Sequence, residues 1–280
     1  MRNLLLLLVS LFSLSLFAQD DLPVGHNQFI AEHYNSLDVA GKMLAYDHVA
    51  WVSSDSIQTL SREELSSYGG QWFCYLDSTG QYHALYGAYD SAYTLTAHYV
   101  VDSTTFAVNR TFQSFDTTLA VLFAKAYNLA LARKREFLGP EDHLRYNHFI
   151  FLSDSTINVH FLPAFQPNGV MIYGAEQHYS LTLDATQIID STEYFNEYRG
   201  YKSDPDQQIT IAYDDLDYTS IGAVFFLMYY EQHFKSIRIL TKNYITTFIR
   251  GKNNKGSWIH AVRAEPKAKK KKKRKKKDNP

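Results

Sequence analysis

The chain is poor in the features that would cross-link it or anchor it in a bilayer. It contains a single cysteine, Cys74, among 280 residues, so no intramolecular disulfide can form and stability has to come from a packed core. Beyond the N-terminal segment the best apolar stretch, residues 221–230, is about half of the ~20 residues that a membrane-spanning helix needs. We therefore expect a mature protein without a transmembrane segment.

The familiar signatures of catalytic and metal sites are also missing. The sequence has no His-Glu-x-x-His pair for zinc, no cysteine pair, no glycine-rich phosphate loop, no Gly-x-Ser-x-Gly nucleophile elbow and no EF-hand loop. Their absence argues against the common motif-bearing enzyme families, and the sequence predicts neither a metal nor a cofactor. It leaves open an enzyme whose residues converge only in the folded chain.

Basic residues are sparse until the C-terminal stretch. The formal net charge is −1, but ten of the 28 Lys and Arg residues lie between positions 267 and 277. Without them, residues 1–266 carry 18 basic against 28 acidic side chains, a formal charge of −10. The sequence therefore describes an acidic body and a cationic tail, in which the candidate polyanion-binding residues are Lys267, Lys269, Lys270, Lys271, Lys272, Lys273, Arg274, Lys275, Lys276 and Lys277.

The tail, residues 266–280, has several interpretations. A run of like charges stays disordered and keeps a protein soluble. The same run can dock on a polyanion such as an anionic membrane, an acidic polysaccharide or nucleic acid, where each basic residue adds on the order of 1 kcal/mol near a membrane, and less in salt. A tail that folds back on its own acidic body would mask both charges.

The N-terminus has the layout of a secretory signal. Arg2 precedes a 14-residue apolar run from Leu4 to Phe17, and Ala18 offers a cleavage site. The run is too short for a permanent anchor. We expect residues 1–18 to be removed on export, which would place the mature protein in the periplasm, at the cell surface or outside the cell.

Hydrophobic periodicity divides the body into helices and strands. It predicts helices over 26–46, 61–67 and 117–137, the second opened by a Ser61–Glu64 capping box and the third capped by Asp116. Residues 219–233 fit a helical face, although their Phe and Tyr content also favours a strand, and we expect a buried helix. Period-two patterns predict strands over 49–53, 72–76, 82–89, 93–101, 105–112, 148–153, 156–164, 170–173, 177–183, 187–195, 209–213, 236–240, 244–250 and 257–262. Residues 196–208 are expected to be a polar connection.

These blocks predict an α+β fold of twisted antiparallel β-meander sheets with two or three packed helices. The two groups of predicted strands, over 72–112 and over 148–195, show no residue-level repeat. The expected organisation is a signal peptide (1–18), a single α+β globular domain (19–265) and a disordered Lys-rich tail (266–280).

One polar constellation could carry chemistry. Glu176 and His178 are two residues apart on a predicted strand and so project from the same face. His160 lies on the preceding strand, across the Asn168-Gly169 turn, so two imidazoles and a carboxylate could meet around a substrate proton or a metal. The alternative is that these side chains line the solvent face of a sheet. Glu176, His178 and His160 are thus the candidate catalytic residues.

Two further features have both a functional and a structural interpretation. Asp214, Asp215 and Asp217 could hold Ca²⁺, although such a run before a helix more commonly caps its N-terminus. The chain is 15% aromatic, and exposed rings could stack on sugars or bind peptides, whereas buried rings would form cross-strand core pairs. The candidate exposed side chains are Trp72, Tyr75, Tyr82, His83, Tyr86, Tyr194, Tyr198 and Tyr201. Cys74 is expected to be a small buried residue.

The leading hypothesis from the sequence is a non-enzymatic exported protein of the envelope or cell surface. Its acidic domain would bind a ligand or partner, and its basic tail would tether it to an anionic surface. A secreted hydrolase that uses Glu176, His178 and His160 is the first alternative. A structural subunit of an envelope assembly is the second.

Overall fold

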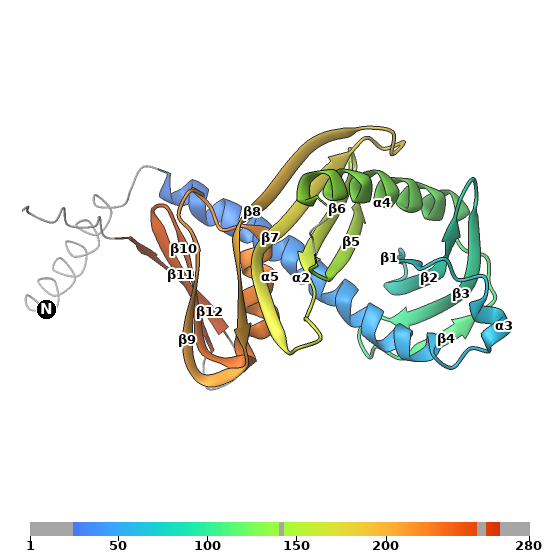
Figure 1. Cartoon of the computed structure of the whole chain (residues 1–280), viewed down its shortest axis with the longest axis horizontal. Helices are drawn as coiled ribbons and strands as arrows, with labels where there is room; N and C mark the ends of the chain where they lie inside the picture. The colour runs from blue at the N-terminus through green and yellow to red at the C-terminus, as the bar shows by residue number, and fades with distance from the viewer. Residues whose placement is uncertain (1–24, 140–142, 251–255, 264–280) are drawn as a thin grey trace, which may run out of the picture.

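A long first helix organises the molecule. The computed structural model describes residues 25–139, 143–250 and 256–263. The first helix within these ranges, α2 (His26–Ile57), runs past all three β-sheets (Figure 1), and its 32 residues span about 48 Å. The buried side chains recur every three or four residues, which is the spacing of one helix face: they include Phe29, His33, Ser36, Ala40, Met43, Asp47 and Ser53.

The predicted strand over 49–53 is wrong, because this segment is part of α2. Its valines favour a strand locally, but Val49, Ser53 and Ile57 continue the buried stripe at four-residue spacing. The Ser53 hydroxyl donates to the Val49 carbonyl (2.6 Å) and contacts the Tyr86 hydroxyl (2.7 Å). Packing against the first sheet therefore outweighs the local strand preference.

The first sheet is the predicted meander. Helix α3 (Arg62–Leu65) precedes it, and both hydrogen bonds of the Ser61–Glu64 capping box are present. The sheet has the order β1-β2-β3-β4 with every neighbour antiparallel. Its strands are β1 (Gln71–Leu76), β2 (Gln81–Tyr89), β3 (Tyr93–Asp102) and β4 (Val108–Thr111).

Helix α4 (Thr117–Leu138) connects the first sheet to the second. The Asp116 carboxylate accepts a hydrogen bond from the Leu119 amide at 2.9 Å, as the capping prediction requires. Phe123, Ala126 and Ala130 are buried in a core cluster that also contains side chains of the first two sheets. Figure 1 shows α4 spanning these sheets on the side away from α2.

The second sheet has the order β5-β6-β7-β8, with β5 (Tyr146–Leu152), β6 (Ile157–Pro163), β7 (Val170–Leu181) and β8 (Ile188–Lys202). Two predicted strands, 170–173 and 177–183, are one strand, β7. Gly174 has a φ of 85° and lies at a register shift against β8, so it forms a bulge where a break was expected.

The third sheet is mixed. Its order is β12-β11-β10-β9, with β9 (Asp204–Tyr213), β10 (Phe234–Thr241), β11 (Tyr244–Arg250) and β12 (Gly256–Val262). Helix α5 (Ile221–Tyr230) and the 3₁₀ turn η1 (Glu231–His233) connect β9 to β10, and these two strands pair in parallel as such a crossover allows. The meander prediction therefore fails for this one pair.

The polar connection expected over 196–208 is also wrong, because β8 extends through Lys202 and β9 begins at Asp204. Both strands lie at an edge of their sheets, and the first five residues of β9 are exposed. Polar residues are compatible with solvent-facing edge strands, which explains why the sequence pattern resembled a loop.

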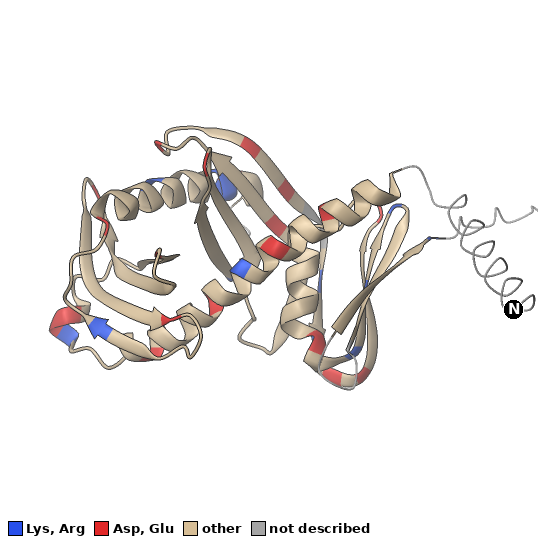
Figure 2. Cartoon of the chain, turned by 180° about the vertical axis from the view of Figure 1, so that it is seen from behind, with Lys and Arg blue, Asp and Glu red and all other residues tan. Residues whose placement is uncertain are grey.

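The fold is mixed α+β with largely antiparallel sheets, as predicted. One core cluster contains side chains of α2, α5 and all three sheets. None of the helices in the described ranges has the length and apolar character to cross a membrane. Acidic side chains are dispersed along α2, β8 and the turns (Figure 2). The predicted signal peptide and basic tail lie outside the described residues.

Candidate ligand-binding pocket

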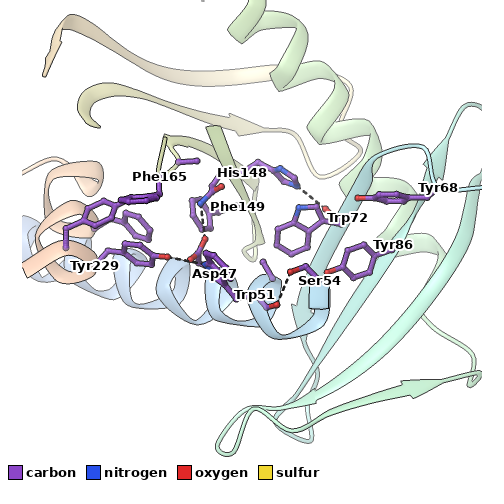
Figure 3. A pocket seen from close by; sticks show the side chains of 15 residues that line it. Asp47, Trp51, Ser54, Tyr68, Trp72, Tyr86, His148, Phe149, Phe165 and Tyr229 are labelled. Carbon is purple, nitrogen blue, oxygen red and sulfur yellow. Dashed lines mark hydrogen bonds between the residues drawn. The ribbon is translucent and has the colours of Figure 1, made fainter. Parts of the chain in front are cut away.

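A cavity of about 400 Å³ lies where α2 and α5 meet the first two sheets (Figure 3). Cavities of this size hold small organic ligands. Nine aromatic side chains line it: Trp51, Tyr68, Trp72, Tyr86, Phe149, Phe165, Phe225, Tyr229 and Tyr230. The remaining lining residues are Asp47, Ala50, Ser54, Asn147, His148 and Ala164.

One face of α2 forms the floor of this pocket. Asp47, Ala50, Trp51 and Ser54 follow the i, i+3, i+4, i+7 spacing that places side chains on one helix face. Two of these residues lie in the segment that was expected to be a strand. The pocket therefore exists because α2 continues past Tyr46.

Rings from opposite sides form the walls. On sheet β1-β2-β3-β4, Trp72 and Tyr86 are directly paired across β1 and β2, and their rings stack at 6.2 Å. On α5, Phe225 and Tyr229 are four residues apart and stack at 5.4 Å. Figure 3 shows Tyr229 and Phe165 on one side of the pocket and Trp72, Tyr68 and Tyr86 on the other, with Asp47 between them.

Asp47 is the acidic group of the pocket. Only 5% of its surface is exposed. One carboxylate oxygen, Oδ1, accepts a hydrogen bond from Asn147 Nδ2 at 2.9 Å, whereas Oδ2 is buried with no hydrogen-bond partner among the described residues. Burial raises the pKa of Asp47, and the nearby Tyr229 hydroxyl and Trp51 indole oppose this with a smaller effect.

His148 is the second titratable group. Its Nε2 lies 2.9 Å from the Trp72 carbonyl oxygen, which can only accept, so we assign the proton to Nε2 and a lone pair to Nδ1. Burial lowers the pKa of His148 to about 4. The imidazole is therefore neutral near pH 7, and it does not neutralise Asp47.

The sequence identified two of the pocket's rings, Trp72 and Tyr86, as candidates for ligand contact. Tyr86 is 4% exposed, and its ring faces the cavity from within the core. The other candidate rings lie elsewhere: Tyr75 stacks on His83, and Tyr201 stacks on Tyr173. Asp47 was missed, because the helix that carries it was expected to end one residue earlier.

The structure brings the predicted site residues together. His160 and His178 are direct cross-strand partners on β6 and β7, with their Nδ1 atoms 2.8 Å apart. His178 Nε2 lies 2.7 Å from Glu176 Oε2. His160 and Glu176 are 7% and 2% exposed, so these two side chains lie in the interior rather than on a solvent face.

Glu176 is saturated with hydrogen bonds. Its carboxylate accepts from four donors: His178 Nε2 (2.7 Å), the Tyr213 hydroxyl (2.8 Å), the Ser220 hydroxyl (2.6 Å) and the Gly222 amide (2.7 Å). Burial alone would raise the pKa of Glu176, but the hydrogen bonds from these side chains hold it below its usual value. The carboxylate thereby fixes the first turn of α5 onto β7.

The imidazoles extend this network without reaching a nucleophile. Because His178 donates to Glu176 through Nε2, a neutral His178 accepts at Nδ1 from His160 Nδ1–H. No serine, threonine or cysteine of the described residues is hydrogen-bonded to either ring. The described ranges also contain no group of three or more His, Cys, Asp or Glu residues placed to hold a metal. A catalytic role for the three residues stays a prediction.

A similar network in sheet β1-β2-β3-β4 was not predicted. His83 Nε2 lies 3.1 Å from Asp77 Oδ2, and His83 Nδ1 lies 2.9 Å from His98 Nε2. Burial and, with a smaller effect, the neighbouring His83 together lower the pKa of His98 to about 4. Each of the two sheets therefore contains a chain of three hydrogen-bonded side chains: a carboxylate, a partly buried histidine and a more deeply buried histidine.

The acidic run at 214–217 does not cap α5, so that expectation is wrong. The cap is the Ser220 hydroxyl, which accepts from the Ala223 amide at 3.0 Å. Asp214 pairs with Arg263, Asp215 accepts from the Tyr194 hydroxyl, and Asp217 lies 3.3 Å from the Lys242 amine. The three carboxylates therefore have three separate partners.

Cys74 is 1% exposed, as expected for a small core residue, and burial raises the pKa of its thiol well above the usual value. The polyanion-binding candidates from Lys267 to Lys277 lie outside the described residues.

Comparison with protein-family models, with curated proteins and with solved structures finds no match.

Proposed function

We propose that this is an exported, non-enzymatic binding protein whose ligand occupies the aromatic pocket, defined here as the cavity between α2, α5 and the first two sheets. The observation that carries the proposal is a cavity of about 400 Å³ lined by nine aromatic rings. A cavity of this size among large apolar rings suits a ligand with an apolar body.

The rim of the pocket supports ligand entry. Trp51 and Phe165 both line the cavity, yet they are 62% and 49% exposed. Exposed aromatic side chains next to a concavity are typical of a binding site that is covered in the complex. The Trp51 indole donates to the Tyr229 hydroxyl at 3.2 Å, which positions this ring across the rim.

The hydrolase hypothesis has weaker support. The Glu176 carboxylate already receives four hydrogen bonds, and a general base must be within reach of a substrate proton. In the aromatic pocket, Asp47 accepts one hydrogen bond, from Asn147, and its Oδ2 atom has no partner at hydrogen-bond distance among the described residues, although the Tyr229 hydroxyl and the Trp51 indole lie near the carboxylate. Binding without catalysis therefore fits the described side chains better.

Export and tethering complete the proposal. The signal-like residues 1–18 would carry the protein out of the cytoplasm, and the basic run from Lys267 to Lys277 would hold it at a polyanionic surface. Heparin and anionic vesicles test the tail: the full chain should elute at higher salt than a variant without residues 267–280. Equal elution would refute the tether and leave the pocket proposal intact.

A panel of small ring compounds tests the pocket. The panel should include neutral and charged benzene derivatives and simple pyranosides, with binding followed by thermal shift and by ligand-observed NMR. Ala50 lines the cavity floor, so Ala50→Phe should fill it and abolish binding. Ala31→Phe is the matched control, since Ala31 is an exposed residue of the same helix.

We expect members of the panel to bind the wild type and Ala31→Phe, and to lose at least tenfold in affinity for Ala50→Phe. If no compound binds the wild type, or if Ala50→Phe binds as well as the control, the pocket is not the ligand site.

A further inference from the structure

The aromatic pocket contains a negative charge that the described protein leaves half-paired. Asp47 is 5% exposed, and its Oδ2 atom has no partner at hydrogen-bond distance among the described residues. The Tyr229 hydroxyl and the Trp51 indole lie near the carboxylate, but they are neutral donors and supply no counter-charge. A buried carboxylate without full pairing is costly, and buried charges are normally paired with a cation or fully hydrogen-bonded. An unpaired oxygen on a cavity wall is therefore a place where a ligand can supply the missing donor.

No counter-charge comes from the pocket itself. None of the described lining residues is Lys or Arg, and Asp47 forms no ion pair among the described residues. The one imidazole of the lining, His148, has a pKa lowered by burial to about 4 and is neutral near pH 7. The lining therefore carries a net negative charge when Asp47 is ionised.

The remaining polar atoms also favour a positive ligand. The Nδ1 lone pair of His148 can accept a hydrogen bond. The Asn147 amide nitrogen is already directed at Asp47 Oδ1. Beyond these groups the lining is rings, and the face of an aromatic ring is negative, so it attracts a cation within about 6 Å of the ring centre.

The alternative occupants use fewer of these features. A neutral sugar could stack on the rings and donate a hydroxyl to Asp47, but it would leave the buried carboxylate without a counter-charge. An anionic ligand would add a second negative charge beside Asp47. An apolar ring would leave Oδ2 unpaired.

Building on the proposed function of the pocket, we infer that its ligand is an organic cation: a protonated amine that donates to Asp47, with an apolar body held between the rings of α5 and those of β1 and β2. The ammonium N–H groups supply both the hydrogen bond and the charge that Oδ2 lacks. The rings contact the carbon body and the polarised C–H groups next to the nitrogen.

A pair of probes that differ in charge tests this inference. 2-Phenylethylamine is protonated at pH 7, and 2-phenylethanol has the same ring and chain with a neutral hydroxyl. Isothermal titration calorimetry of both compounds should show that the wild type binds the amine at least tenfold more tightly. Asp47→Asn should bring the amine down to the affinity of the alcohol.

The control variant carries the same substitution on the same helix. Asp55 is an exposed residue of α2, so Asp55→Asn changes the net charge of the protein equally and should keep the preference for the amine. Thermal melts of both variants establish that they are folded before the titrations are interpreted.

Three results would overturn the inference. Equal affinity for amine and alcohol, with both lost in Ala50→Phe, overturns the inference about charge but leaves the pocket as a binding site. Undiminished amine binding by folded Asp47→Asn overturns the role of Asp47. Failure of the wild type to bind either probe also overturns the inference, and the wider ring panel then decides separately whether the pocket binds anything.

Discussion

Replacing Glu176 should weaken the fold rather than remove a dispensable catalytic group. Its carboxylate is 2% exposed and accepts from His178, Tyr213, Ser220 and Gly222 at 2.6 to 2.8 Å. Glu176→Ala leaves these four donors in the interior without an acceptor. Glu176→Gln keeps the shape but turns an NH₂ group toward donors that needed an oxygen.

The expected magnitudes follow from the number of lost acceptors. A buried donor that loses its partner costs about 1 to 3 kcal/mol, and removing one member of a buried charged network costs about 3 to 5 kcal/mol. Water can enter the space left by the carboxylate and pair some of the donors. We therefore expect Glu176→Ala to lose about 4 kcal/mol or more, and Glu176→Gln to lose about 2 kcal/mol.

Urea unfolding followed by circular dichroism at pH 7 measures these losses. A Glu176→Gln variant within 0.5 kcal/mol of the wild type, roughly the effect of an ordinary surface substitution, would refute the structural interpretation of this network. It would also revive the hydrolase hypothesis, since catalytic carboxylates are often replaceable without loss of stability.

Gly222 provides an independent check through a double-mutant cycle. A Cβ atom at this position would meet the Glu176 carboxylate at 2.3 to 2.8 Å, so Gly222→Ala should be strongly destabilising in the wild type. In a Glu176→Ala background the obstructing carboxylate is gone, and most of that cost should disappear. Additive losses would show that the carboxylate does not lie on the first turn of α5.

Three further predictions concern burial. Burial lowers the pKa values of His33, His98 and His148 to about 4, below their unfolded value near 6.5. The folded protein is therefore fully stable above pH 6.5, where these imidazoles are neutral in both states, and it loses stability as the pH falls toward 4, because only the unfolded chain takes up the protons. At pH 5 each of these pKa shifts lowers the free energy of unfolding by about 2 kcal/mol, and by less for the partly exposed His148. Melting temperatures measured from pH 7.5 to 5 should fall steeply, and a flat profile would contradict the buried, neutral state. Cys74 should react with thiol reagents only on unfolding, and rapid labelling of the native protein would contradict its burial. Asp47→Asn should melt at or above the wild-type temperature at pH 7, because the raised pKa of Asp47 means that its ionised form destabilises the fold as the pH rises; a drop of several degrees would show that the carboxylate is a structural group.

The sequence predicted elements best where local signals agreed. Capping by Asp116 and the Ser61–Glu64 capping box are short-range features, and both are present. The pairing of His160 with His178 was also predictable, since the Asn168-Gly169 turn joins two adjacent antiparallel strands. A hairpin fixes which side chains face one another, and period two places Glu176 on the same face as His178.

The failures all involve tertiary context. Residues 49–53 have a local preference for strand, but contact with sheet β1-β2-β3-β4 keeps them in α2. Gly174 resembled a strand end and is a bulge whose position depends on pairing with β8. The sequence did not identify Asp47 as a pocket residue, because the helix was expected to end at Tyr46. Only a longer helix places Asp47 on one face with Ala50, Trp51 and Ser54. A pocket assembled from six separate segments of the chain has no signature in any one of them.

The three tryptophans provide the most direct test of the central claim, that the aromatic pocket binds a ligand. Trp51 and Trp72 line the pocket, whereas Trp258 lies on β12 against His33. In the ¹⁵N-indole NMR spectrum, with signals assigned by Trp→Phe variants, we expect 2-phenylethylamine to shift the Trp51 and Trp72 resonances in a saturable manner and to leave Trp258 unchanged. No shift at millimolar ligand, or a shift of Trp258 equal to the other two, would contradict the account.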